Sequence, residues 1–226
     1  MWIFPTRHRP LRLQRCLDAC VSTHMSSRGL IIIDGFERDY EKLQVPPNLN
    51  VMATNDHIGF GAVLNLAFKL HPNEPFYGWV PDDCVPRTEC WDARLEEACG
   101  RWYIGCSNNL LHTVPWWTPG TFGGDLLRSV GYIAPPGFVH LYIDNVWNFI
   151  NDHLHVYRYL PDVVIEEMHF SNNKAPYDNT YERVVKGVYH YESDKLAFEN
   201  YVKAHATHQM LDRVAQAMRT HNAITD

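Results

Sequence analysis

The chain has 226 residues, which is enough for one well-buried domain and short for two. Its net charge of −6, from 20 basic and 26 acidic residues, excludes the generally basic surface that nucleic-acid-binding proteins carry. DNA is disfavoured as a partner but stays open, because Arg7, Arg9, Arg12 and Arg15 form a short basic cluster.

The first half of the chain alternates strand and helix patterns. Strand patterns cover residues 2–4, 29–33, 50–53, 76–80 and 102–106, and helix patterns cover residues 10–21, 62–70 and 88–99. Strands separated by helices of this length predict crossover units on a mostly parallel sheet, which is an α/β fold. Ligands bind such sheets beyond the carboxyl ends of the strands, where this sequence places Thr6, Arg7, Asp34, Asp82 and Asp83.

The second half is less regular. We expect a loop at 115–124, helices at 125–130 and 144–153, strands at 156–160 and 163–165, and a polar loop at 171–181. A single long helix is predicted over 193–221, with one apolar stripe. That stripe can dock on its own domain or on a second subunit, so a homodimer stays open.

The cysteines and the hydropathy pattern indicate a reducing, aqueous compartment. The six cysteines form no CxxC pair, which argues against a zinc ribbon or a thioredoxin-type motif. A domain of this length does not need disulfides, so we expect reduced thiols and a cytoplasmic protein. Pro5 interrupts the N-terminus before any long apolar run, which argues against a signal peptide, and no stretch approaches the ~20 apolar residues of a membrane span.

The strongest candidate site is the pair Asp82 and Asp83, directly after a buried strand. Adjacent carboxylates repel each other and are costly to desolvate, and a divalent cation such as Mg²⁺ or Mn²⁺ removes that cost. Such ions commonly bridge carboxylates to a diphosphate. The alternative interpretation is a solvated turn in which Asp82 caps the next element.

Three further residues have two interpretations each. His169 follows a strand pattern and is either a metal ligand or a structural histidine. Asp144 precedes a helix pattern, where it either caps the helix or acts as a general base. Asp34 ends its strand before Gly35, where it either accepts hydrogen bonds from a nucleotide or forms a turn.

Together these motifs resemble the glycosyltransferase A fold, in particular the small inverting, family-two-like enzymes of bacteria and phages. The opening residues 3–10, IFPTRHRP, are similar to the first strand and the Pro-Ser/Thr-Arg-x-Arg-Pro loop of that group. Residues 30–35 are similar to its second strand, and residues 79–88, WVPDDCVPRT, resemble its DxD region. Residues 140–145, HLYIDN, look like its acceptor segment, and residues 168–170, MHF, look like the late segment with a histidine ligand.

The resemblance implies a single Rossmann-like catalytic domain at residues 1–182, with residues 183–226 as a helical extension packed on the same domain. It implies transfer of a sugar, with inversion, from a nucleotide-sugar that by family habit is a UDP-sugar. It assigns Asp83 and His169 to Mn²⁺ or Mg²⁺, and Asp144 to the catalytic base. The donor contacts would be Pro5, Thr6, Arg7, Arg9, Asp34 and Asp82, with Asp82 on the ribose or on the ion. The loop with Trp116 and Trp117, together with Gly123 and Gly124, either shapes the acceptor side or has a core or lid role.

The acceptor stays open between a glycan and another hydroxyl compound, including the hydroxymethylated DNA bases that phage enzymes modify. Two rivals also remain: a nucleotidyltransferase and a nucleotide-sugar-binding protein without turnover. A nucleotidyltransferase would carry a Gly-rich, Lys-bearing loop after the first strand, which residues 6–9 lack. Absence of GxGxxG, P-loop and GxSxG motifs argues against dinucleotide oxidoreductases, P-loop kinases and α/β-hydrolases.

Overall fold

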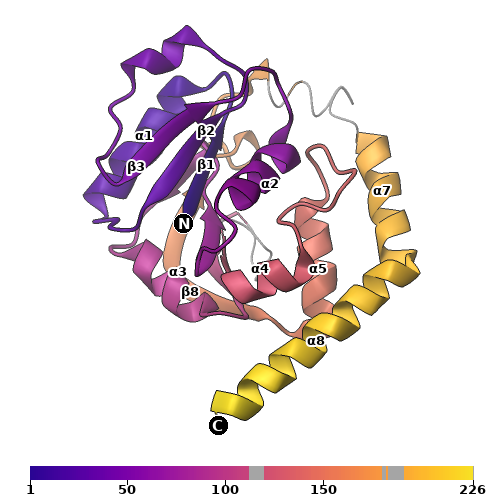
Figure 1. Cartoon of the computed structure of the whole chain (residues 1–226). Coiled ribbons are helices and arrows are strands. Elements are labelled where there is room, and N and C mark those ends of the chain that lie inside the picture. Colours follow the sequence, from indigo (N-terminus) through magenta and orange to yellow (C-terminus); the bar gives the residue numbers. More distant parts are fainter. Residues whose placement is uncertain (112–119, 180–181, 183–190, 226) are drawn as a thin grey trace.

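A computed structural model of the chain describes residues 1–111, 120–179, 182 and 191–225. Its strands are β1 (Trp2–Thr6), β2 (Gly29–Ile33), β3 (Leu49–Ala53), β4 (Phe76–Trp79), β5 (Cys84–Pro86), β6 (Ile104–Asn108), β7 (Gly120–Gly123) and β8 (Tyr157–Glu167). They form one eight-stranded sheet in the order β3-β2-β1-β4-β7-β6-β8-β5. Figure 1 shows this sheet at the centre of the molecule.

The sheet is mixed and mostly parallel. β1 pairs in parallel with β2 and β4, β2 with β3, and β6 with β8. Antiparallel pairs join β7 to β4 and β6, and β5 to β8. The α/β prediction with a mostly parallel mixed sheet and a C-terminal helix is therefore confirmed, and the carboxyl ends of β1, β2 and β4 meet at one edge.

The helices are α1 (Pro10–Ser22), α2 (Phe60–Leu70), α3 (Trp91–Cys99), α4 (Gly124–Val130), α5 (Ile143–Leu154), α7 (Tyr191–Lys203) and α8 (His205–Thr225), with 3₁₀ turns η1 (Arg38–Lys42) and η2 (Phe170–Asn172). α1 begins at Pro10, whose fixed φ suits the first helical position. Its buried residues recur at helical spacing, so one face packs on the sheet; they are Leu13, Cys16, Leu17 and Cys20.

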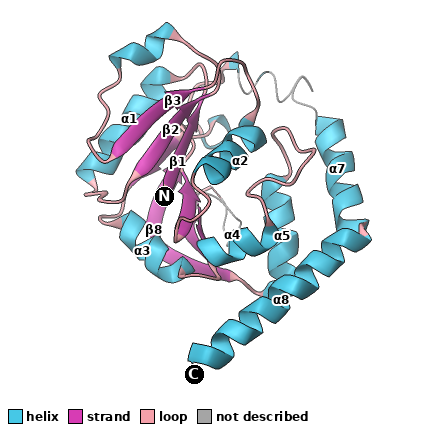
Figure 2. Cartoon of the chain, viewed as in Figure 1, coloured by secondary structure: helices cyan, strands magenta, loops and turns pink. Residues whose placement is uncertain are grey.

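Two apolar cores lie on opposite faces of the sheet, and Figure 2 shows helices on both sides of the strands. One core joins side chains of α1 and α3 to the sheet, including Leu17 and Trp91. The other joins α2, α4, α5 and α8, including Leu64, Trp147 and Val214. This arrangement buries the central strands from both faces, as parallel strands require.

A close approach of β1 and β4 brings the site together. A Cβ atom on Gly78 would lie 2.5 Å from the ring of Trp2, which pairs with Gly78 in the sheet. Only glycine leaves room for the Trp2 ring there. The two strands therefore run side by side and deliver Thr6 and Asp82 to the same place.

The structure corrects several predicted elements. The predicted loop at 115–124 is wrong for residues 120–123, which form β7; Trp116 and Trp117 fall outside the described residues. The predicted single helix at 193–221 is two helices, α7 and α8, with a break at residue 204. The separate strands at 156–160 and 163–165 are one strand, β8, and β5 was not predicted.

The C-terminal helices contact the rest of the chain. α8 buries Met210, Leu211 and Val214 and packs against α4 and α5, and α7 packs against α5. The apolar stripe predicted for this segment thus faces its own chain. Within the described residues, we find no helix with the length and hydropathy that a membrane crossing requires.

Candidate functional site

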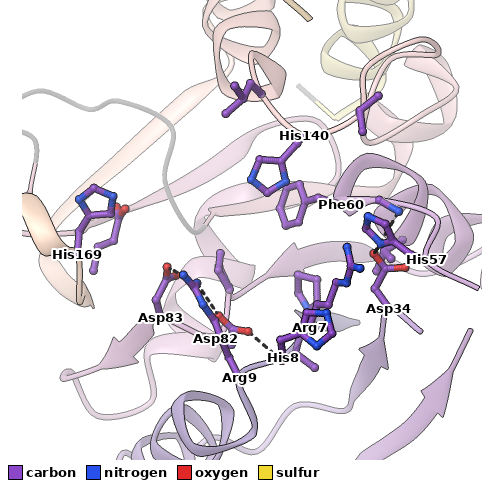
Figure 3. A pocket seen from close by; sticks show the side chains of 18 of the residues that line it. Arg7, His8, Arg9, Asp34, His57, Phe60, Asp82, Asp83, His140 and His169 are labelled. Atoms are coloured by element: carbon purple, nitrogen blue, oxygen red, sulfur yellow. Dashed lines mark hydrogen bonds and ion pairs between the residues drawn. The ribbon is translucent and has the colours of Figure 1, made fainter. Parts of the chain in front are cut away.

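A cavity of about 520 Å³ opens at the edge of the sheet where β1, β2 and β4 end. Its walls come from the loops after these strands, the start of α2, the segment before α5 and the end of β8; they are formed by Pro5, Thr6, Arg7, His8, Arg9, Asp34, His57, Gly59, Phe60, Val63, Pro81, Asp82, Asp83, Val139, His140, Leu141, Glu167, His169 and Phe170. Figure 3 shows Asp34 and His57 at one end and Asp83 and His169 at the other. This volume is typical of cavities that hold a small-molecule ligand.

The end of the cavity that contains Asp82 and Asp83 is its acidic end. Asp82 is almost fully buried there. It accepts a hydrogen bond of 2.8 Å from the Thr6 hydroxyl, which lies 2.8 Å from the Tyr40 hydroxyl. Tyr40 in turn accepts the Arg9 backbone N–H at 3.0 Å. Burial and then the charge of Asp83 raise the pKa of Asp82 to about 7, and Arg9 and Thr6 offset this only in part.

Glu167 is a third carboxylate at this end, on the last residue of β8. Its side chain accepts a hydrogen bond of 2.9 Å from Asn109. Burial and then the charge of Asp83 raise the pKa of Glu167 to about 7. Three acidic side chains therefore crowd the same end of the cavity, and their repulsion disfavours full ionisation.

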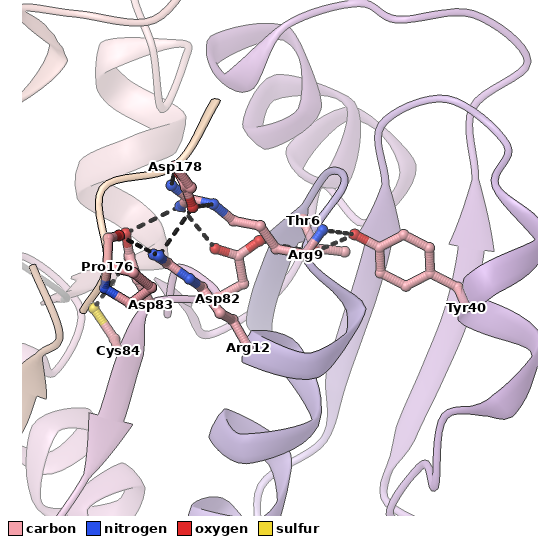
Figure 4. Close-up of polar contacts among 9 residues, drawn as sticks. All are labelled: Thr6, Arg9, Arg12, Tyr40, Asp82, Asp83, Cys84, Pro176 and Asp178. Carbon is pink, nitrogen blue, oxygen red and sulfur yellow. Dashed lines mark hydrogen bonds and ion pairs between the residues drawn. The ribbon is translucent and has the colours of Figure 1, made fainter. Parts of the chain in front are cut away.

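Arg9 supplies the positive charge nearest to this cluster. Its Nη1 lies 3.4 Å from Asp82 and 3.2 Å from Asp83. Its other nitrogens bind both oxygens of Asp178 at 3.0 and 2.9 Å. Arg12 lies 2.9 Å from Asp178 as well, so α1 and its preceding loop hold the segment after η2 beside the acid pair (Figure 4).

The opposite end of the cavity is built around Asp34. Its carboxylate accepts the backbone N–H groups of Ile58 at 2.8 Å and Gly59 at 3.1 Å, and it lies 2.6 Å from His57 Nδ1. Gly59 has a φ of 89°, a conformation that favours glycine. Asp34 thus fixes the loop between β3 and the start of α2.

One wall of the cavity is held from behind by the C-terminal extension. Asp194 on α7 is fully buried and accepts the backbone N–H groups of Val139, His140 and Leu141 at 3.1, 3.0 and 2.8 Å. The His140 ring packs edge-on against Phe60, with 5.7 Å between centroids. Burial lowers the pKa of His140, more than the nearby Asp194 raises it.

Eight of the nine predicted site residues line this one cavity. They are Pro5, Thr6, Arg7, Arg9, Asp34, Asp82, Asp83 and His169. Asp144 does not line it as described; it occupies the first turn of α5, close enough for its charge to raise the pKa of Glu167. The roles assigned to these residues stay predictions.

Sequence reasoning missed His57 and Glu167 as cavity residues. His57 follows the third parallel strand, so the rule that polar residues after parallel strands share one edge could have found it. Glu167 was visible only as a neighbour of His169. Its position depends on the pairing of β8 with β5, which places the Met168 N–H 2.8 Å from the Asp83 carbonyl oxygen.

The acidic end has donor chemistry that suits a divalent cation. Carboxylate oxygens from Asp82, Asp83 and Glu167 and the imidazole of His169 face the same cavity. The raised pKa values of Asp82 and Glu167 indicate a shortage of positive charge. As placed, no three His, Cys, Asp or Glu side chains of the described residues converge tightly enough to hold an ion by themselves.

Comparison with known proteins identifies the fold. No family model and no curated protein matches the sequence. Among solved structures, the chain is similar to TarS 1–349 of S. aureus in complex with UDP, with a TM-score of 0.54, 15% identity, and coverage of 73% of this chain and 58% of that one. It is also similar to GalNAc-T7 with UDP, GalNAc and Mn²⁺, with a TM-score of 0.59, 8% identity, and coverage of 74% and 43%.

A third similar structure is glucosyl-3-phosphoglycerate synthase of Mycobacterium tuberculosis in complex with Mn²⁺, UDP and glucosyl-3-phosphoglycerate. Its TM-score is 0.57 at 10% identity, with coverage of 83% of this chain and 77% of that one. The described chain thus has the glycosyltransferase A fold, as the sequence motifs predicted. It spans little more than half of TarS 1–349, so the likeness extends to the fold and not to a whole enzyme.

Proposed function

We propose that this chain is a metal-dependent glycosyltransferase that moves a sugar from a UDP-sugar to an acceptor hydroxyl with inversion. The observation that carries the proposal is one cavity with two unlike ends. Three crowded carboxylates lie at one end and a preformed polar recess at Asp34 and His57 lies at the other. That pattern suits a ligand with a metal-bound diphosphate and a nucleotide base.

The similar structures support this proposal through their ligands. TarS and the mycobacterial synthase were solved with UDP, and the synthase and GalNAc-T7 also with Mn²⁺. The transferred group would be a hexosyl or pentosyl unit, and the ion Mn²⁺ or Mg²⁺. All six cysteines are free, which suits a reducing compartment, and we propose the cytoplasm.

Different residues of the cavity would contact different parts of the donor. Pro5, Thr6 and Arg7 flank the nucleotide, and Thr6 keeps Asp82 oriented through its 2.8 Å hydrogen bond. Asp83 and His169 would hold the divalent ion, which would supply positive charge against the diphosphate leaving group. Arg9 remains beside the same phosphates as a fixed positive charge.

Asp144 is the proposed base. It would take the proton of the acceptor hydroxyl as that oxygen attacks the anomeric carbon on the face opposite the diphosphate. A single displacement of this kind inverts the anomeric centre. Asp144→Asn should lower kcat by about 10²–10⁴-fold and leave the dissociation constant of UDP unchanged.

Melting temperatures with UDP and with GDP, each with and without Mn²⁺, test the donor site. Ligands that bind the folded state raise the melting temperature by mass action. We expect a shift that needs UDP and Mn²⁺ together and that disappears in Asp83→Ala. No shift with any pair would contradict the proposal.

Product analysis then separates the enzyme classes. A glycosyltransferase releases UDP from a UDP-sugar, whereas a nucleotidyltransferase forms or consumes pyrophosphate. The anomeric configuration of the product, read by NMR, tests inversion. A donor that binds but is neither transferred nor hydrolysed would indicate a binding protein without turnover.

A further inference from the structure

Asp34 is a weak candidate for direct contact with a nucleotide base, because donors of the protein already hydrogen-bond to both of its carboxylate oxygens. Its protein partners are the backbone N–H groups of Ile58 and Gly59, His57 Nδ1 and, at 3.5 Å, the Thr54 hydroxyl. Its side chain is only 7% exposed, whereas that of His57 is 39% exposed. The group that this end of the cavity offers to a ligand is therefore the His57 ring.

The contact with Asp34 fixes which nitrogen of the His57 ring carries the proton. An ionised carboxylate only accepts hydrogen bonds, so the Nδ1 atom at 2.6 Å must carry a proton. In a neutral imidazole the other nitrogen, Nε2, is then an acceptor. Within the described part of the chain, Nε2 of His57 has no hydrogen-bond partner, and geometry directs it away from Asp34.

We propose that His57, oriented by Asp34, reads the nucleotide base through Nε2, which accepts the ring N–H of uracil. This inference rests on the proposed function and names the base that the donor carries. Uracil presents an N–H donor at N3, whereas cytosine presents a lone pair at the same position. Two acceptors facing each other leave both unpaired, so the neutral ring selects against cytosine.

The loop geometry supports a reading role over a purely structural one. Asp34 would hold residues 58 and 59 by their backbone N–H groups whatever side chain stood at position 57. The ring itself lines the cavity, and its side chain is 39% exposed. Phe60 and His140 line the same cavity, with their rings packed against each other.

Isothermal titration with UDP and CDP, both with Mn²⁺ at about pH 8 where an ordinary imidazole is neutral, tests the inference. Wild-type protein should bind UDP at least ~10-fold more tightly than CDP. His57→Ala should reduce that preference to within ~3-fold, chiefly through weaker UDP binding. His57→Gln should bind both nucleotides, because an amide donates as well as accepts.

His24→Asn is the matched control. His24 is an exposed histidine just after α1 and is not among the described residues that line the cavity. Its φ of 58° is one that asparagine tolerates. This variant should keep the UDP preference of the wild type.

The outcomes separate this inference from the proposed function. If the wild type binds neither nucleotide, the proposed function fails. If it binds UDP and the ratio to CDP is unchanged in both His57→Ala and His57→Gln, the donor site stands and the role of His57 is overturned. Equal binding of UDP and CDP by the wild type would also overturn it.

Discussion

The two ends of the cavity are built in opposite ways. At one end, the Asp34 carboxylate accepts hydrogen bonds from backbone and side-chain donors of the protein, and the loop around it is fixed. At the other end, Asp82 and Glu167 have raised pKa values because burial and the charge of Asp83 outweigh the partners they have. The protein completes the first end alone, and the second end needs added positive charge.

This difference indicates where stability and function conflict. Groups that bind a charged ligand must remain incompletely neutralised without it, and that costs folding free energy. Groups that shape a recess can be fully satisfied in the empty protein. Removal of a carboxylate should therefore stabilise the metal-free protein at the acidic end and destabilise it where the carboxylate is fully hydrogen-bonded.

Of the substitutions that compare the two ends, Asp83→Asn has the largest expected effect. Loss of this carboxylate should lower kcat/KM by more than ~100-fold, because the proposed metal ion would lose a ligand. The same change should raise the melting temperature of metal-free protein, because it relieves the repulsion on Asp82 and Glu167. Thermal unfolding in EDTA and initial rates with Mn²⁺ measure the two effects; a lower melting temperature in EDTA would contradict the charge argument.

Arg9→Met should destabilise the metal-free protein by about 3 kcal/mol, because it leaves largely buried carboxylates without their nearest counter-charge. Mn²⁺ should restore part of this loss in the variant and change wild-type stability less. Urea unfolding with and without Mn²⁺ measures the difference. Arg87→Met, which removes an ion pair to Glu166 on the far side of β8, is the control and should show no Mn²⁺ dependence.

Asp194→Ala extends the comparison to the cavity wall at residues 139–141, whose backbone N–H groups donate to Asp194. It leaves the N–H groups of Val139, His140 and Leu141 without their acceptor, which should cost about 2–3 kcal/mol. It should also raise KM more than it lowers kcat, because the wall loses its position and the carboxylates keep theirs. Asp194→Asn, which keeps one acceptor oxygen, should have a stability and a KM between those of the wild type and of Asp194→Ala. Equal effects of both variants would count against this role.

The smallest expected effect is the pH dependence at His140. Burial lowers the pKa of this ring in the folded state, so its contribution to stability is present above the ordinary histidine pKa of about 6.5 and is lost as pH falls below it. His140→Phe keeps a ring against Phe60 and removes the titration. The free energy of unfolding of the wild type should fall relative to the variant between about pH 7 and pH 5. The two proteins must be compared with each other, because the raised pKa values of Asp82 and Glu167 make both proteins more stable as the pH falls, which masks the effect of His140 in the wild type alone.

The strands that form the ligand-binding edge of the sheet are predictable from local sequence. Apolar runs such as residues 29–33 are buried on both faces, so their pattern alone predicts central parallel strands. The carboxyl ends of parallel strands meet, and for this reason the sequence alone places Thr6, Asp34 and Asp82 in one site. The motif order also predicted the glycosyltransferase A fold, which the solved structures bear out.

The contacts that the site residues make follow only from the tertiary structure. The pairing of β8 with β5 brings Glu167 to Asp83, and these residues are far apart in sequence with no local pattern that links them. The packing of α7 against α5 places Asp194 behind the cavity wall, where its acceptor role depends on backbone groups and not on side-chain types. The engagement of Asp34 with His57 likewise follows from loop geometry, because hydrogen-bond partners are set by distance in space and the sequence specifies only which groups can form them.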